Sequence, residues 1–145
     1  MSGAALMRSG EPCTVELRIP AQPENLSLAR LALAGVGSIA GAPDDVVADL
    51  KVAVTEACTN AIQHAYSEGG DGAVIVRYRI GDALLEVEIV DAGTGFDPSD
   101  PAAGNENSGG QGMGLMIIRE LTDDVVIESD GNGSRIFFQK RLQSI

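Results

Sequence analysis

Three short segments of the chain combine glycines with side chains that could act on a phosphate group. They occur in the order Glu56–His64, Asp91–Phe96 and Gly110–Leu115. Carboxylates and carboxamides supply the oxygen ligands that Mg²⁺ accepts, and glycines let backbone amides approach a phosphate or a planar base. The sequence contains no GxxxxGK[ST] motif, which excludes a Walker-type phosphate site.

The first segment lies in a run with the spacing of an amphipathic helix. Apolar residues recur at helical intervals from Asp44 to Tyr66. Glu56 and Asn60 are one turn apart at the edge of the apolar face, and His64 continues the same stripe. Polar groups there cost desolvation energy unless they are paired, and a divalent ion with a polyphosphate would pair them. An isolated ExxxN pattern more often marks a solvated helix edge, so the interpretation depends on its neighbours.

The second segment follows a strand of strict alternation, which puts Asp91 at a strand end. A carboxylate there can accept a hydrogen bond from an exocyclic amine such as that of adenine. Gly93 and Gly95 allow a tight turn, and their missing Cβ atoms let a planar base lie against the main chain. Taken alone, DxGxG is also an ordinary turn signal.

The third segment puts Gly110, Gly112 and Gly114 at the N-terminus of a predicted helix, ahead of the amphipathic stretch 115–121. Backbone amides and the helix dipole favour phosphate oxygens at such a position. The glycine spacing is not that of a dinucleotide fold, and no strand leads directly into it. A flexible hinge is the competing interpretation.

The three segments, in this order, resemble the N, G1 and G2 boxes of the GHKL ATPase superfamily. Within it, they are most similar to the small bacterial anti-sigma-factor serine kinases. The runs that carry the resemblance are TEACTNAIQHAY, DAGTGFDP and GGQGMGLMII. The resemblance extends from about Thr14 to the C-terminus.

The resemblance implies a role for each part of the site. Glu56 would be the general base, Asn60 the ligand of Mg²⁺, and Asp91 the residue that holds the adenine of ATP. Ser134 stands where family members often have a threonine that assists the adenine contact. A lid over about residues 97–111 would be hinged at the glycines of the third segment. The remaining residues assigned to nucleotide binding lie within the three boxes: His64, Gly93, Gly95, Phe96, Gly110, Gly112, Met113, Gly114 and Leu115.

The resemblance also implies a function. The protein would be a Mg²⁺- and ATP-dependent serine/threonine protein kinase acting as an anti-sigma factor, usually as a homodimer. It would phosphorylate a STAS-type anti-anti-sigma factor and sequester an alternative sigma factor. Two alternatives remain open: a sequestration module that binds ATP without phosphotransfer, and a kinase whose partner switch involves no sigma factor.

Two other GHKL classes fit the sequence less well. A sensor histidine kinase needs a phosphoacceptor histidine in a helical hairpin, and the one histidine here is His64 within the first box. A chaperone, gyrase or mismatch-repair ATPase would need further domains to couple hydrolysis to movement.

Composition narrows the range of partners. The net charge of −11 and the dispersed Lys and Arg argue against direct nucleic-acid binding. A basic protein partner and simple solubility explain the acidity equally well. No apolar run reaches about 20 residues and the N-terminus does not resemble a signal peptide, so we expect a cytoplasmic protein that does not enter a membrane. Cys13 and Cys58 are expected to be reduced, structural thiols.

The expected architecture is one α+β domain over residues 13–145, after a flexible segment of residues 1–12. It would be a two-layer sandwich in which helices lie on one face of a mixed, mostly antiparallel sheet. Strands are predicted at 14–19, 73–80, 83–90, 125–129 and 134–141, and helices at 23–39, 44–66 and after the lid.

The first predicted strand and the first predicted helix form a candidate partner surface outside the three boxes. Arg30 is the one charge between Glu24 and Asp44, and Asn25, Leu28 and Leu31 lie on the same helix. Arg30 is therefore the predicted partner contact, with a solvated helix face as the alternative.

Overall fold

The computed structural model describes residues 13–67, 72–91, 110–130 and 133–142. Five strands form a single sheet in the order β1-β2-β3-β5-β4. Every adjacent pair is antiparallel, so among the described strands the sheet is not mixed as predicted. The strands are β1 (Cys13–Pro20), β2 (Ala73–Gly81), β3 (Leu84–Asp91), β4 (Asp124–Asp130) and β5 (Gly133–Arg141).

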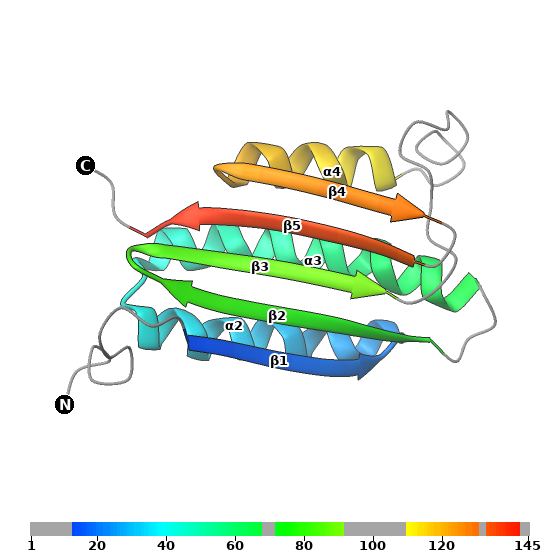
Figure 1. Cartoon of the computed structure of the whole chain (residues 1–145), viewed down its shortest axis with the longest axis horizontal. Coiled ribbons are helices and arrows are strands. Elements are labelled where there is room, and N and C mark those ends of the chain that lie inside the picture. The colour runs from blue at the N-terminus through cyan, green and yellow to red at the C-terminus, as the bar shows by residue number, and fades with distance from the viewer. Residues whose placement is uncertain (1–12, 68–71, 92–109, 131–132, 143–145) are drawn as a thin grey trace.

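The described helices all cover the same face of the sheet (Figure 1). They are a 3-10 turn η1 (Pro23–Asn25), α2 (Leu26–Ala40), α3 (Asp44–Ser67) and α4 (Gly110–Leu121). The prediction of a two-layer α+β sandwich with helices on one face is thus confirmed. The predicted helix at 23–39 begins as a 3-10 turn, where Pro23 has no N–H and the Asn25 side chain donates to the Pro20 carbonyl.

The core lies between the sheet and α3, the central helix. The side of α3 that meets the sheet is lined by small and medium residues with no exposed surface: Leu50, Ala53, Val54, Ala57 and Cys58. Alternate residues of β2 face it, including the fully buried Tyr78. The Tyr78 hydroxyl donates to the Ala29 carbonyl at 2.6 Å and so ties α2 to the sheet. The helical periodicity and the strand alternation in the sequence both reflect this interior.

Two boundaries differ from the prediction. Ala83 lies in the turn between β2 and β3 rather than in a strand, with φ 58°, because a two-residue hairpin turn requires left-handed backbone. Helix α4 begins at Gly110, so positions 110 and 111 are helical instead of forming the end of a lid. Glycine costs about 1 kcal/mol in a helix, and the packing of α4 against α3 offsets that cost. The rest of the predicted lid, like the segment 1–12, lies outside the described residues.

Within the described residues, no helix is long and apolar enough to cross a membrane.

Candidate functional site

The first and third segments meet where α4 packs against α3. Glu56 is half-buried and Asn60 is only 4% exposed, at the edge of α3 that faces α4. A Cβ atom at Gly114 would lie 2.8 Å from Glu56 Oε1 and 3.8 Å from Asn60 Nδ2. Any side chain at this position would push the carboxylate away. The absence of one is therefore what lets the backbone of α4 lie directly over both polar groups.

The second segment meets Ser134 at the other half of the site. Asp91 is the last residue of β3, and its cross-strand partner in β5 is Ser134. Both are buried, and the Ser134 hydroxyl donates a hydrogen bond to Asp91 Oδ2. A carboxylate can accept about four hydrogen bonds, so this contact fixes its orientation without exhausting its capacity.

The two halves lie at the same end of the molecule. Figure 1 shows the end of β3, the start of β5 and the start of α4 together at this end. The C-terminal half of α3 extends toward the same end. The topology therefore gathers residues that are up to 78 positions apart in sequence, from Glu56 to Ser134.

This donor set fits a magnesium ion that is shared with phosphate groups. The described residues contain no group of three or more His, Cys, Asp or Glu side chains that could bind a metal ion by themselves. Mg²⁺ commonly takes one or two protein oxygens and completes its shell with phosphate oxygens and water. Asn60, beside Glu56 and close to the backbone of α4 at Gly114, offers such a partial site.

The other predicted site residues are only partly described. Gly93, Gly95 and Phe96 lie outside the described residues. His64 belongs to α3 and Met113 to α4, but their side chains are not described. Gly110 and Gly112 lie in the first turn of α4, where helix amides have no intrahelical partner. Leu115 is half-buried and packs against the core.

Arg30 is not a freely solvated side chain. Its Nη1 donates to Thr55 Oγ1 at 3.1 Å, and the Thr55 hydroxyl in turn donates to the Lys51 carbonyl at 2.7 Å. The link joins α2 to α3 one residue before Glu56. Sequence reasoning did not identify Thr55. Its position on α3, one helical turn after Lys51 and away from the apolar face, could have suggested a contact with a neighbouring helix.

Cys58 takes no part in this chemistry. Burial raises the pKa of its thiol to about 12, and the charge of Arg30 offsets only part of that effect. The thiol is therefore protonated at neutral pH and is not a nucleophile. Both Cys13 and Cys58 are free, as predicted.

Comparisons with known proteins identify the family. Residues 19–140 match the family described as "Histidine kinase-like ATPase domain". The chain is 39% identical to serine-protein kinase RsbW of Bacillus subtilis over 124 residues, which are 79% of this chain and 78% of the relative. It is 40% identical to serine-protein kinase RsbW of Listeria monocytogenes over 125 residues, which are 80% of each chain.

Solved structures share the fold. The RsbU and RsbW domains of Rv1364c from Mycobacterium tuberculosis superpose with a TM-score of 0.68 at 20% identity. That match covers 90% of this chain and 32% of the longer one, so the chain spans about a third of that protein. The histidine kinase domain of the blue-light activated kinase EL346 from Erythrobacter litoralis gives a TM-score of 0.58 at 23% identity, over 86% and 62% of the two chains.

Proposed function

The chain belongs to the histidine kinase-like ATPase domain family, among the relatives of the serine-protein kinase RsbW, and we propose that it transfers the γ-phosphoryl group of ATP to a serine or threonine of a small regulatory protein. The family resemblance inferred from the sequence is thereby confirmed. The observation that carries the proposal is the close approach of Gly114 to Glu56 and Asn60, because it brings the backbone of α4 next to a carboxylate and a carboxamide. Phosphoryl transfer depends on such positioning more than on covalent chemistry.

Glu56 is the general base of the proposed reaction. Its carboxylate would accept the proton of the substrate hydroxyl as the oxygen attacks the γ-phosphorus. Asn60 would hold the Mg²⁺ ion, which neutralises phosphate charge when it is bound. The first-turn amides of α4 would donate hydrogen bonds to the phosphate oxygens and stabilise the charge that develops on them.

Asp91 and Ser134 recognise the base in this proposal. The Asp91 carboxylate would accept a hydrogen bond from the exocyclic amine of adenine, with the Ser134 hydroxyl holding the carboxylate in place. A guanine has a carbonyl oxygen at that position and would repel the carboxylate, so the arrangement favours ATP over GTP. By family resemblance, Gly93, Gly95 and Phe96 would complete this part of the site.

The proposed partners are an anti-anti-sigma factor of the STAS type as substrate and an alternative sigma factor as the sequestered protein. Their proposed docking surface is α2, where Leu28 is 46% exposed and Leu31 is 71% exposed. Arg30 lies between them in sequence, and no acidic side chain pairs with it among the described residues. Held by Thr55, it offers a pre-oriented cation to a partner carboxylate.

The proposal extends to the organisation of the protein. Residues 13–145 would form one kinase domain that works as a homodimer in the cytoplasm, where its ATP and sigma factor are found. No contact with nucleic acid is part of the proposal.

The test is transfer of label from γ-labelled ATP to a panel of the host's STAS-domain proteins. Wild type, Glu56→Ala and the matched control Glu120→Ala are compared; Glu120 is exposed on α4. We expect acid-stable phosphoserine or phosphothreonine on one protein, with wild type and Glu120→Ala but not with Glu56→Ala. If ATP binds and no protein is labelled, the protein is a sequestration module. Labelling by Glu56→Ala at the wild-type rate would show that another group is the base.

A further inference from the structure

Arg30 carries the one charge on α2, and its surroundings differ from those of the other arginines in the fold. Three arginines among the described residues are half-buried: Arg30, Arg77 and Arg135. A half-buried charge has lost part of its hydration and needs compensation, whereas an exposed charge is stabilised by water. The partners of these three side chains therefore indicate what each of them serves.

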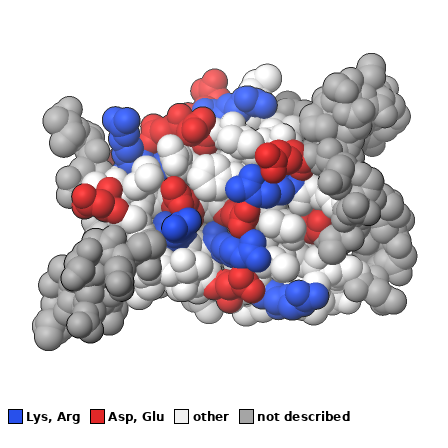
Figure 2. Space-filling model, in the orientation of Figure 1, with Lys and Arg blue, Asp and Glu red and all other residues white. Residues whose placement is uncertain are grey.

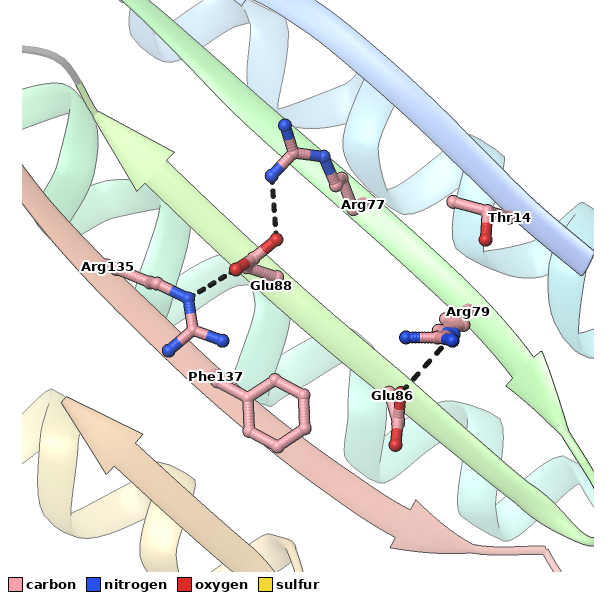
Figure 3. Close-up of a pocket in the computed structure, with 7 residues that line it drawn as sticks. All are labelled: Thr14, Arg77, Arg79, Glu86, Glu88, Arg135 and Phe137. Atoms are coloured by element: carbon pink, nitrogen blue, oxygen red, sulfur yellow. Dashed lines mark hydrogen bonds and ion pairs between the residues drawn. The ribbon is translucent and has the colours of Figure 1, made fainter. Parts of the chain in front are cut away.

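Arg77 and Arg135 lie on the sheet face opposite the helices, where each is paired with two carboxylates. Figure 2 shows positive and negative side chains interleaved on this face. Arg77 donates to Glu16 and to Glu88 at 2.7 Å each. Arg135 pairs with Glu88 and, at 3.2 Å, with Glu128. The hollow shown in Figure 3 is likewise lined by arginines that are turned toward glutamates. These charges are compensated within the chain.

Arg30 has no carboxylate partner among the described residues. Its Nη1 donates instead to the hydroxyl of Thr55 on α3, at 3.1 Å. This bond uses one of the five N–H groups of the guanidinium and brings no negative charge to it. The packing of α2 against α3 therefore leaves the charge of Arg30 uncompensated, and a carboxylate of a bound protein would compensate it.

The hydroxyl of Thr55 can only accept from Arg30. A guanidinium has no acceptor, and the single proton of the hydroxyl is donated to the Lys51 carbonyl at 2.7 Å. The Thr55 oxygen therefore presents a lone pair to Arg30. The backbone beside Arg30 is held as well, because the buried hydroxyl of Tyr78 donates to the Ala29 carbonyl at 2.6 Å. Both ends of the Arg30 side chain are thus fixed, one to the sheet and the other to α3.

Thr55 directly precedes Glu56 on α3, but the two side chains meet different helices. Thr55 contacts Arg30 of α2. Glu56, about 100° further round the helix, lies close to Gly114 of α4. A substrate protein that binds Arg30 and presents its hydroxyl to Glu56 therefore lies across the outer side of α3. Val52, one turn before Glu56, is 45% exposed and offers an apolar contact to such a partner.

We propose that Thr55 is a positioning residue for phosphotransfer, whose hydroxyl holds the Arg30 guanidinium so that a carboxylate of the docked substrate protein binds at a fixed place relative to Glu56. The inference rests on the proposed function. An arginine that is already ordered loses less rotational freedom when the partner binds. Ordering one long side chain at an interface corresponds to about two- to tenfold in affinity. Thr55 itself contacts neither ATP nor the substrate and acts only through Arg30.

Thr55→Val removes the hydroxyl and changes little else, because valine has the same branched shape and a similar helix propensity. Thr55→Ser keeps the hydroxyl and should keep the bond to Arg30. Thr122→Val is the matched control. The Thr122 hydroxyl also donates to the carbonyl four residues before it, at 2.7 Å, but among the described residues it has no arginine partner. Arg30→Met removes the charge and keeps most of the length of the side chain.

The experiment is steady-state kinetics of the full chain on the STAS-domain protein identified by the labelling experiment, at saturating ATP, with circular dichroism to verify folding. We expect Thr55→Val to raise the KM for that protein by about two- to tenfold, with unchanged kcat and ATP affinity. Thr55→Ser and Thr122→Val should behave as wild type. Arg30→Met should raise the KM at least as much, and adding Thr55→Val to it should change nothing further.

Several results would overturn the inference. A wild-type KM in Thr55→Val would show that the bond to Arg30 is unimportant, and a KM raised equally by Thr55→Ser would show that the hydroxyl is. A parallel loss of kcat or ATP affinity would indicate general damage to α3, and a further rise of the KM in the Arg30→Met background would show that Thr55 does not act through Arg30. In these cases transfer by wild type leaves the proposed function standing. If wild type labels no STAS-domain protein, the proposed function fails and the inference fails with it.

Discussion

Two regions of the molecule are organised by opposite means: the proposed nucleotide-binding end, which we call the nucleotide end, and the face of the sheet opposite the helices, which we call the open face. At the nucleotide end, a missing side chain at Gly114 brings the α4 backbone onto Glu56 and Asn60. On the open face, long charged side chains fill the surface and pair with one another from strand to strand. At the nucleotide end, there is no space for even one added carbon atom at Gly114. The arrangement on the open face is distributed over several exposed ion pairs, each worth about 1 kcal/mol or less. A single methyl group added at Gly114 should therefore abolish most of the activity, whereas the loss of one ion pair on the open face should have only a small effect.

The largest effect is expected for Gly114→Ala, at the nucleotide end. The new methyl group would lie 2.8 Å from Glu56 Oε1, so either the carboxylate or α4 must move. A displacement of about 1 Å at a reacting group costs roughly 100-fold in rate, and we expect a loss of phosphotransfer of at least about that size. Single-turnover transfer rates measure it.

Gly35→Ala is the matched control. Position 35 is also a helical glycine, but no atom lies within 4 Å of its added Cβ. Because Gly35 lies on α2, the proposed docking surface, both variants are compared at a saturating concentration of the substrate protein, where the transfer rate of Gly35→Ala should equal that of wild type. Its stability should rise by about 0.5–1 kcal/mol. Equal rates for the two alanine variants would show that the close contact at Gly114 is unimportant.

A smaller effect is expected at the base-binding half of the same end. In Ser134→Ala, Asp91 loses the hydrogen bond that orients its carboxylate. Loss of a hydrogen bond to a charged group costs about 1.5 kcal/mol, which corresponds to roughly tenfold weaker ATP binding by calorimetry. Ser134→Thr keeps the hydroxyl and should restore the affinity. Weak binding by the threonine variant as well would point to a steric role for this position.

The smallest effect is expected on the open face, in the response to acid. Burial alone would raise the pKa of Glu88, but hydrogen bonds from Arg135 and Arg77 outweigh it and lower the pKa below its ordinary value. A lowered folded-state pKa means that the ionised carboxylate stabilises the fold above the unfolded-state pKa, about 4.3, and that this contribution is lost as the pH falls.

Glu88→Gln therefore gives a direct comparison. Denaturant unfolding at neutral pH should show a loss of about 1 kcal/mol for the variant, and the difference from wild type should shrink as the pH is lowered through the range below 4.3. Glu86→Gln is the control, since its pairing with Arg79 is loose. A difference that stays constant with pH would exclude ionic stabilisation by Glu88.

Much of the fold could be predicted because its signals are local. The alternation of β2 and β3 and the helical spacing of α3 each report a buried face in one contiguous stretch. The departures had local causes too: left-handed backbone at Ala83, and a helix that extends through its glycines to Gly110.

The site was only partly predictable because its contacts join distant segments. The box motifs made Glu56, Asn60 and Asp91 candidate site residues, but no pattern in the sequence shows that a Cβ at Gly114 would collide with Glu56. The Arg30–Thr55 hydrogen bond depends on the packing of α2 against α3. The ion pairs on the open face depend on the register of the strands. Charged residues alternate with apolar ones in β2 and β3, which is compatible with ion pairs on one face of the sheet. The sequence did not show that β5 lies between β3 and β4 and so brings Arg135 next to Glu88.

The most direct test of the nucleotide end separates binding from transfer. ATP affinity is measured with and without Mg²⁺, together with the single-turnover transfer rate, for wild type, Glu56→Ala and Asn60→Ala. The account predicts that Glu56→Ala binds ATP as wild type does and transfers no phosphate, while Asn60→Ala loses the Mg²⁺-dependent part of the affinity. Parallel loss of binding and transfer in Glu56→Ala would contradict it, because Glu56 would then hold the site together instead of acting as its base.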